Sequence, residues 1–225
     1  MSGRLQIYEK LLQFSLFQGM SRDDLELVAG HTRFGFIKIP KGKPVVKDGA
    51  VCTHLHFLIS GTIRTVSSSD DHSYIVEEDM QAPFMLQPEA IYGYNQRYTH
   101  TFVAMTDASF ITIDKDEVGR LSEDFLVFRL NLLNIYATQV QKMSRQLWRQ
   151  CPKTLRERIV RFFVLHCAYP AGAKMFHILM NQLADELNDS RLNVSRELNS
   201  MQYDGLLILH RGRIEIPSLE HMLMA

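Results

Sequence analysis

The side chains best suited to chemistry lie in the stretch SRLNVSR, Ser190–Arg196, of this chain of 225 residues. In a helix, Val194, Leu198 and Met201 would form one apolar face at i, i+4 and i+7, which leaves the polar side chains opposite. Arginine can pair bidentately with guanine, while serine and asparagine can reach bases or phosphates. The stretch therefore predicts a helix that reads DNA. Its candidate contacts are Ser190, Arg191, Leu192, Asn193, Ser195, Arg196 and Asn199.

Turn and capping residues before this helix would position it. Leu183, Ala184 and Leu187 predict a short preceding helix with one apolar face. Asn188–Asp189 favours a tight turn, because both side chains can bond their own backbone. Ser190 suits an N-cap, since its hydroxyl can accept a backbone N–H of the next helix. These elements together predict a helix-turn-helix.

A candidate β-hairpin follows. Asp204–Gly205 would end the helix, because glycine supplies the positive φ that helix C-termini often need. Leu206–Leu209 and Ile214–Ile216 read as two short strands, and Arg211 and Arg213 between them are candidate contacts to the DNA backbone or minor groove. The C-terminal segment therefore predicts a winged helix-turn-helix. The alternative is a small packed domain that does not touch DNA.

Charge and cysteine usage narrow the class of protein. The formal net charge is zero, and residues 151–225 hold nine Lys and Arg against eight Asp and Glu. Attraction to phosphate must therefore come from the local placement of Lys174, Arg191, Arg196, Arg211 and Arg213, which points to binding as a dimer. Cys52, Cys151 and Cys167 form no C-x-x-C pair, so we expect neither a zinc ribbon nor an iron–sulfur cluster. The N-terminus has no apolar leader and no run would span a bilayer, so we expect a soluble, cytoplasmic protein.

After a helical start, short β-rich runs alternate with turn signals such as Lys41–Gly42, Asp48–Gly49 and Ser60–Gly61. Runs at this spacing predict a sandwich or barrel of jelly-roll character. The expected strands are Phe34–Ile39, Pro44–Lys47, His54–Ile59, Thr62–Ser67, Tyr74–Glu77, Thr101–Met105 and Phe110–Ile113.

A long helix is predicted next, beginning at Ser122 or Asp124 and free of Gly and Pro until Pro152. Its apolar residues alternate spacings of four and three, which is a heptad seam roughly 40 Å long. We expect one face to cover the β-rich domain and the seam to meet its copy in a homodimer. The expected dimer contacts are Leu126, Leu130, Leu133, Ala137, Val140 and Leu147. Cys151, before a proline, is a natural hinge.

This order of elements resembles the Crp–Fnr superfamily of bacterial transcription regulators over essentially the whole chain. The most specific match is Ser190–Arg196, which is similar to that family's recognition motif. The resemblance implies base contacts at Arg191, Leu192 and Arg196. Leu192 stands where the family commonly has Glu, so an apolar contact to a thymine methyl is expected in its place.

The sensor side departs from the family members that bind cyclic AMP. Those members carry a Gly-Glu pair and then Arg-Ser or Arg-Thr in a phosphate-binding turn, and here the arginine position falls near Thr99. Arg97 could substitute only with a fixed geometry, so we expect no cyclic AMP binding of the usual kind. The candidate pocket residues are Glu89, Tyr92, Arg97, Tyr98, Thr99 and His100. His54 and His56 share one strand face and leave a haem or metal site as an alternative, so the effector stays unassigned.

The sequence thus predicts an α+β chain. It has a double-stranded β-helix (jelly-roll-like) sensor domain at residues 1–121, a long dimerisation helix at 122–150 and a winged helix-turn-helix at 151–225. We expect a homodimeric transcription regulator that binds an inverted-repeat operator and, by the resemblance, works with RNA polymerase. No nucleophile–base pair or phosphate-cradling Gly loop is present, so we expect no enzyme. The rival interpretation is a ligand-binding or protein-interaction module whose helix-turn-helix does not read DNA.

Overall fold

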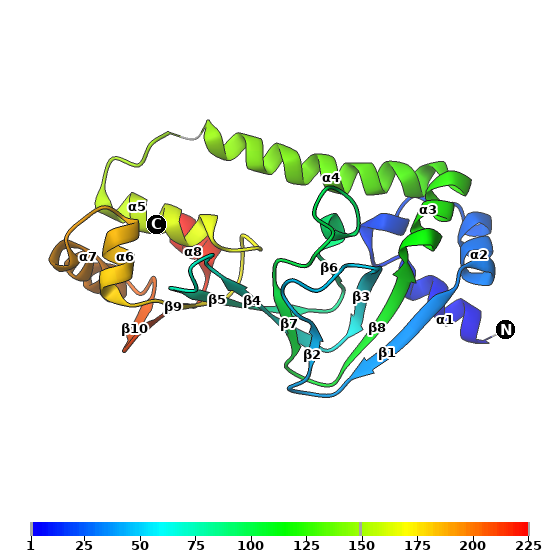
Figure 1. Ribbon diagram of the computed structural model, residues 1–225, viewed down its shortest axis with the longest axis horizontal. Coiled ribbons are helices and arrows are strands. Elements are labelled where there is room, and N and C mark those ends of the chain that lie inside the picture. The colour runs from blue at the N-terminus through cyan, green and yellow to red at the C-terminus, as the bar shows by residue number, and fades with distance from the viewer. Residues whose placement is uncertain (1, 149, 225) are drawn as a thin grey trace. The chain divides into compact units, whose positions relative to one another are not determined.

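The computed structural model describes residues 2–148 and 150–224, apart from the side chains of residues 2–6 and 147. The chain forms two compact units. Unit 1 comprises Met1–Ile63, Gln81–Thr99 and Val103–Arg149, and unit 2 comprises Arg64–Met80, His100–Phe102 and Gln150–Ala225. Their helices and strands carry the labels of Figure 1.

An antiparallel sheet with the strand order β1-β8-β3-β6 forms the centre of unit 1. The strands of this unit are β1 (Phe34–Ile39), β2 (Pro44–Val46), β3 (His54–Ser60), β6 (Phe84–Leu86) and β8 (Ala108–Asp114), and β7 (Thr101–Ala104) crosses the unit boundary. Alternation along β3 turns Leu55 and Phe57 inward, and both are fully buried. The Phe57 ring meets Phe14 and Phe17 at centroid distances of 5.0 and 5.8 Å, which joins the sheet to the N-terminal helices.

Unit 1 also contains helical segments, named here from the N-terminus onward. They are α1 (Ser2–Leu11), η1 (Ser15–Phe17), α2 (Arg22–His31), η2 (Pro88–Ile91), α3 (Lys115–Asp124) and α4 (Leu126–Leu147). Ser21 begins α2 as expected of an N-cap, because its hydroxyl accepts the Asp24 backbone N–H at 3.1 Å. Acidic Asp23 and Asp24 then lie in the first turn, where the helix dipole favours negative charge.

The long helix begins later than predicted. A start at Ser122 or Asp124 is wrong, since those residues end α3 and Phe125 is extended between α3 and α4. On α4, Phe128 is fully buried, and the Asn131 amide donates to the carbonyls of Leu16 at 3.0 Å and Gln18 at 2.8 Å. One face of α4 therefore packs on its own unit, as expected.

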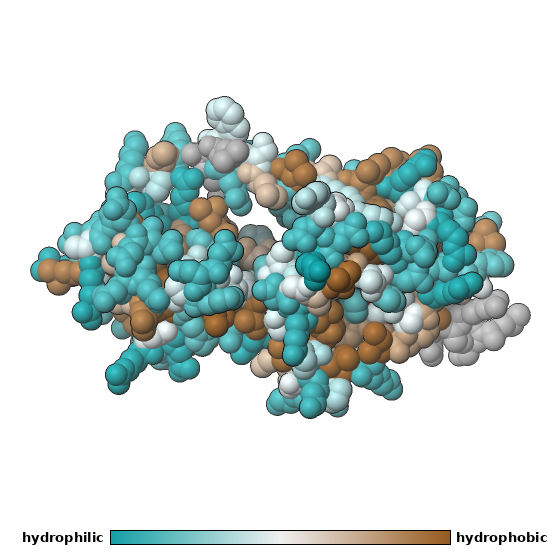
Figure 2. Space-filling view, viewed as in Figure 1, coloured by the Kyte–Doolittle hydropathy of each residue, from teal (hydrophilic) through white to brown (hydrophobic). Residues whose placement is uncertain are grey.

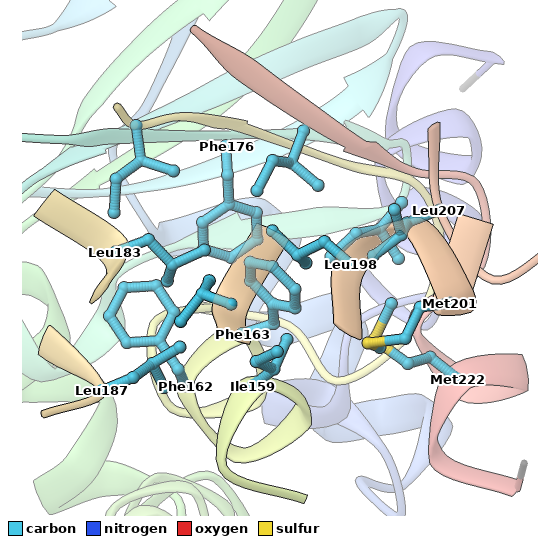
Figure 3. Close-up of a cluster of buried hydrophobic side chains, with 14 of the residues drawn as sticks. Ile159, Phe162, Phe163, Phe176, Leu183, Leu187, Leu198, Met201, Leu207 and Met222 are labelled. Atoms are coloured by element: carbon cyan, nitrogen blue, oxygen red, sulfur yellow. The ribbon is translucent and has the colours of Figure 1, made fainter. Parts of the chain in front are cut away.

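In unit 2 the strands follow the order β10-β11-β9-β5-β4. They are β4 (Thr62–Ser68), β5 (Ile75–Gln81), β9 (Lys174–His177), β10 (Ile208–His210) and β11 (Arg213–Ile216), and the outer ends of β4 and β5 extend into unit 1. The helices of unit 2 are α5 (Leu155–Leu165), α6 (Met180–Glu186), α7 (Arg191–Tyr203) and α8 (Leu219–Met224). Figure 3 shows the core between them, where Phe162 and Phe163 of α5 face Phe176 of β9. The Phe163 and Phe176 ring centroids are 4.7 Å apart.

Several strand predictions are corrected. The strands β6 and β9 were not expected, and β5 runs from Ile75 to Gln81 in place of Tyr74–Glu77. The first wing strand is Ile208–His210, because Leu206 and Leu207 lie buried in the core before it. Both leucines are removed from water in the core without being part of a strand, so the strand begins two residues later than predicted.

Candidate nucleic-acid interface

The recognition helix predicted from sequence is α7, and its two faces separate as expected. Val194, Leu198 and Met201 are fully buried in the unit 2 core, and Figure 3 shows Leu198 and Met201 there. By contrast, Arg191, Leu192, Asn193, Arg196 and Asn199 are exposed, and Ser195 is half-buried. Because the core fixes one face, the opposite face is presented in one orientation.

Some of the predicted contact residues already have structural bonds. The Ser190 hydroxyl accepts the Asn193 backbone N–H at 3.2 Å, and the Asn193 amide donates to the Asp189 carboxylate at 2.9 Å. Asn199 donates to the carbonyl of Ser195 at 2.7 Å. Ser190 and Asn193 therefore cap the helix, and α7 begins with backbone N–H groups that favour an anion such as a phosphate.

The turn before α7 is fixed from α5. Asn188 has a positive φ of 49°, and the Asp189 N–H donates to the carbonyl of Ala184 at 3.0 Å. Arg158 donates to the carbonyl of Leu187 at 2.8 Å and to the Asp189 carboxylate at 2.5 Å. Hydrogen bonds from Asn193, the Ser190 N–H and Arg158 lower the pKa of Asp189.

Neighbouring arginines neutralise acidic residues around α7. Arg156 of α5 pairs with Asp204 and lies 3.9 Å from the Glu197 carboxylate, while Arg158 pairs with Asp189. Within residues 2–148 and 150–224, the ion pairs include none of four exposed arginines. These four are Arg191, Arg196, Arg211 and Arg213. The exposed side of α7 and the wing thus carries four arginines that take part in none of the ion pairs among the described residues.

The β10–β11 wing presents Arg211 and Arg213, both exposed, around a turn at Gly212 with φ of 74°. The Gln202 amide oxygen accepts the Leu209 N–H at 2.7 Å, which ties the wing to α7. Sequence reasoning missed Gln202, Arg156 and Arg158 as supporting residues. Arg156 and Arg158 bond groups 29 to 48 positions away, and no local pattern indicates such pairs.

Several of the predicted effector residues form hydrogen bonds within the chain. Glu89 and Thr99 come together through Gln87, which the sequence did not single out. The Gln87 amide donates to the Thr99 hydroxyl at 2.8 Å and to the Glu89 carboxylate at 3.3 Å, and its oxygen accepts the Thr99 N–H at 3.0 Å. The hydroxyl and the backbone N–H of Thr99, at the expected phosphate-binding turn, therefore both form hydrogen bonds with Gln87.

The other effector candidates point elsewhere. Arg97 donates to the carbonyl of Gly49 at 2.6 Å, and the Tyr92 hydroxyl lies 3.5 Å from the carbonyl of Lys115. His100 belongs to unit 2, where its Nδ1 lies 2.9 Å from the Ser67 hydroxyl. Tyr98 is buried. These contacts are made within each unit, and whether the six candidates share a pocket stays a prediction.

The buried Tyr98 side chain forms polar contacts with His54 and His56 of β3. Its hydroxyl donates to the carbonyl of His54 at 3.1 Å and lies 3.1 Å from His56 Nδ1. Burial raises the pKa of Tyr98 and lowers the pKa of His56 to about 4. Among the residues that the structure describes, no group of three or more His, Cys, Asp or Glu side chains is placed to hold a metal ion.

The predicted dimer seam on α4 is exposed. Leu126, Leu130, Leu133 and Val140 are 57%, 48%, 55% and 64% exposed. Ala137 is also exposed, and the side chain of Leu147 lies outside the described residues. Figure 2 shows hydrophobic residues in brown over α4. None of the described helices combines the length and apolar character needed to cross a membrane.

The chain was compared with protein families, curated proteins and solved structures. Residues 36–125 match the family model for the cyclic nucleotide-binding domain. A comparison with curated protein sequences gave no match. Among solved structures, the catabolite activator protein of Thermus thermophilus is 19% identical with a TM-score of 0.54, covering 93% of this chain and 97% of that one.

Two further solved structures are similar to this chain. A protein from Eubacterium rectale described as a transcriptional regulator of the Crp/Fnr family is 20% identical with a TM-score of 0.54, covering 95% of this chain and 99% of that one. The sensor domain of the transcriptional regulator DNR from Pseudomonas aeruginosa is 16% identical with a TM-score of 0.54, covering 68% and 99%. At such identities the likeness shows the fold. Residues 36–125 are therefore similar to the cyclic nucleotide-binding domain, and the chain has the fold of these Crp–Fnr regulators.

Proposed function

We propose that this protein is a homodimeric, sequence-specific DNA-binding transcription regulator of the Crp–Fnr superfamily that works in the cytoplasm. The observation that carries the proposal is the exposed face of α7, where Arg191, Leu192 and Arg196 stand free of the core that holds the opposite face. Paired carboxylates around the helix leave that face positive. A helix of this kind suits the major groove, with the wing on the flanking backbone.

The individual contacts follow from side-chain chemistry. Arg191 and Arg196 pair with guanine edges or the phosphates beside them, and the exposed Leu192 contacts a thymine methyl. Asn193 and Ser190 hold the start of α7 against a phosphate, because their side chains already cap the helix. Arg211 and Arg213 reach the backbone or the minor groove from the wing.

Dimerisation follows from the exposed α4 seam. Leucine and valine at alternating spacings of four and three pack against a second copy in a coiled coil. The dimer axis would place two α7 helices in successive major grooves about 34 Å apart, so the operator is an inverted repeat. Two copies also double the phosphate contacts, which offsets the low net charge. As a transcription regulator, the protein would work with RNA polymerase.

The effector domain does not bind cyclic AMP in the usual way, and the protein is not an enzyme. Gln87 bonds both the hydroxyl and the N–H of Thr99, Arg97 bonds Gly49, and Tyr98 is buried. Arg97, the arginine beside that turn, directs Nη1 to the Gly49 carbonyl, which does not favour bidentate pairing with a phosphate. This proposal is supported by the match of residues 36–125 to the cyclic nucleotide-binding domain and by the likeness of the fold to the catabolite activator protein and to the Crp/Fnr regulator from Eubacterium rectale.

Selection from randomised DNA duplexes tests the proposal. We expect an enriched inverted repeat whose half-sites lie about one helical turn apart, bound with an affinity that falls steeply with salt. Binding without sequence preference, or salt-insensitive binding to a protein partner, would support the interaction-module alternative instead.

A further inference from the structure

The strand β5 comes from the part of the chain that matches the cyclic nucleotide-binding domain, yet it pairs with the first strand of the C-terminal segment. The antiparallel partners are Ile75 with His177, Val76 with Phe176, Glu77 with Met175 and Glu78 with Lys174. The β4–β5 hairpin, residues 64–80, accordingly belongs to the same compact unit as α5–α8. The strand order β10-β11-β9-β5-β4 makes the hairpin an extension of the wing sheet.

A buried ion pair joins the last pair of residues in this strand pairing. Lys174 Nζ lies 2.8 Å from Glu78 Oε1, and the two side chains are 1% and 0% exposed. The Glu78 carboxylate also accepts the backbone N–H groups of Ala168 at 2.8 Å and Tyr169 at 3.1 Å. All its described partners thus come from the segment after α5. A buried carboxylate left without these donors would be strongly unfavourable, so the contact does not open cheaply.

Apolar packing holds the hairpin from the side of the core. Tyr74 and Val76 are buried in the same cluster as the α5 and α7 side chains. The Tyr74 ring lies 5.6 Å from Phe162 and 5.3 Å from His166, in both cases edge to face. On the other side of the hairpin, Arg64 of β4 bonds Glu77 at 2.9 Å and Asp79 at 2.6 Å, which joins its two strands.

We propose that the β4–β5 hairpin is a permanent part of the DNA-reading unit and serves as its control arm. The arm moves with α7 as one body, so the cyclic nucleotide-binding domain acts on α7 through β4 and β5 as well as through the segment around Cys151. The role of the arm as a regulator of DNA reading rests on the proposed function. Its attachment to the C-terminal unit does not, since that follows from the strand pairing and the ion pair.

Hydrogen exchange on the full-length protein tests the attachment without DNA. Glu78→Gln removes the charge partner of Lys174, so amides of β5 and β9 should lose protection together, by about 100-fold. Exchange in β3 and β8 of unit 1 should stay as in the parent. The matched control Glu26→Gln breaks an ion pair whose side chains are 75% and 63% exposed and should change nothing. Loss of protection in β5 with β9 unchanged would overturn the proposal.

A second variant covers a Glu78→Gln protein that does not fold. Replacing both partners, as Glu78→Met with Lys174→Met, leaves no unpaired charge and should retain the common protection of β5 and β9. If these two strands exchange at rates that differ by more than about 10-fold in that variant or in the parent, they do not form one cooperative unit and the attachment is wrong.

A reversible cross-link tests whether the arm stays attached on DNA. Glu77→Cys and Met175→Cys place two thiols at directly opposite positions, where Cα atoms lie about 4.5–5.5 Å apart and a disulfide fits. With Cys151 replaced by Ser, the oxidised and reduced forms should bind the selected operator within about twofold of each other. Failure to form the disulfide, or a loss of affinity above about 10-fold on oxidation, would overturn the proposal. A parent that binds no DNA would refute the proposed function and leave the exchange result standing.

Discussion

Arg158 and Asp189 join α5 to the turn that starts α7: Arg158 Nη2 lies 2.5 Å from Asp189 Oδ2, and Arg158 Nη1 donates to the carbonyl of Leu187 at 2.8 Å. The same carboxylate accepts the Ser190 N–H at 2.8 Å. The Asp189 side chain, held by Arg158, therefore fixes the turn, the N-cap and the first turn of α7. The direction in which α7 presents its arginines depends on this pair.

We expect Arg158→Ala to lower the free energy of unfolding by about 1–2 kcal/mol, because it removes charged hydrogen bonds that are only partly screened by solvent. Urea denaturation of the purified protein measures the change. Arg22→Ala is the control, since its ion pair with Glu26 is exposed and should contribute less than about 0.5 kcal/mol. Equal losses for both variants would mean that Arg158 does not hold the turn.

His56 predicts a pH dependence of stability. Burial lowers its folded-state pKa to about 4 from a usual value of 6.5. Between these values the unfolded chain takes up a proton that the folded protein does not, so stability is full above about pH 6.5 and falls toward pH 4. The expected loss is about 1–3 kcal/mol. His56→Gln should flatten this part of the denaturation profile.

The elements found from sequence are those with a local signal. The bounds of α7, Arg191–Tyr203, follow from the Ser190 cap and the Asp204–Gly205 stop, and both are readable from the chain. The break at Phe125 carries no Gly or Pro, so the separation of α3 from α4 was not visible. An extended residue without a breaker is set by packing, which a single sequence does not display.

The strand β9 and the Gln87 contacts could not be found in the same way. The expectation that Lys174 attracts phosphate is wrong, because this lysine is buried against Glu78, 96 positions earlier in the chain. A lysine normally indicates an exposed position. Gln87 has a positive φ of 30° and bonds Thr99, 12 positions later. Both depend on long-range pairing of polar groups, and periodicity reports only which face is apolar.

Dimerisation through α4 is tested by placing a charge in the seam. Leu133→Glu should give a monomer in analytical ultracentrifugation at a concentration where the parent is a dimer, because a carboxylate in an apolar seam has no partner. Lys142→Glu changes the charge on the opposite side of the helix and should leave the dimer intact. A parent that sediments as a monomer at micromolar concentration would remove the coiled-coil interface.

Cyclic AMP at millimolar concentration should give neither calorimetric heat nor a thermal shift. The Thr99 N–H and hydroxyl bond Gln87, and the Arg97 guanidinium bonds Gly49. A ligand that binds the native state would raise its melting temperature, so a thermal scan detects even weak binding. A saturable shift would mean that Gln87 yields its place and that another cation pairs with the phosphate.

DNA readout separates the roles of Arg196 and Arg211. Arg196 lies on the exposed face of α7, and its replacement by Ala should cost about 1–3 kcal/mol per half-site and flatten sequence preference at one base position. Arg211 lies on the wing, and we expect it to contact the DNA backbone, so Arg211→Ala should weaken all sequences alike and reduce the salt slope by about one per contact.

Competition binding on the selected operator, on single-base variants and across a salt series distinguishes the two outcomes for each variant. The stability of both proteins must match the parent in urea, which is expected because neither side chain takes part in the core. If Arg196→Ala keeps both the affinity and the preference of the parent, α7 is not the reading helix. The exposed positive face would then bind something other than base edges, and the interaction-module alternative would stand in its place.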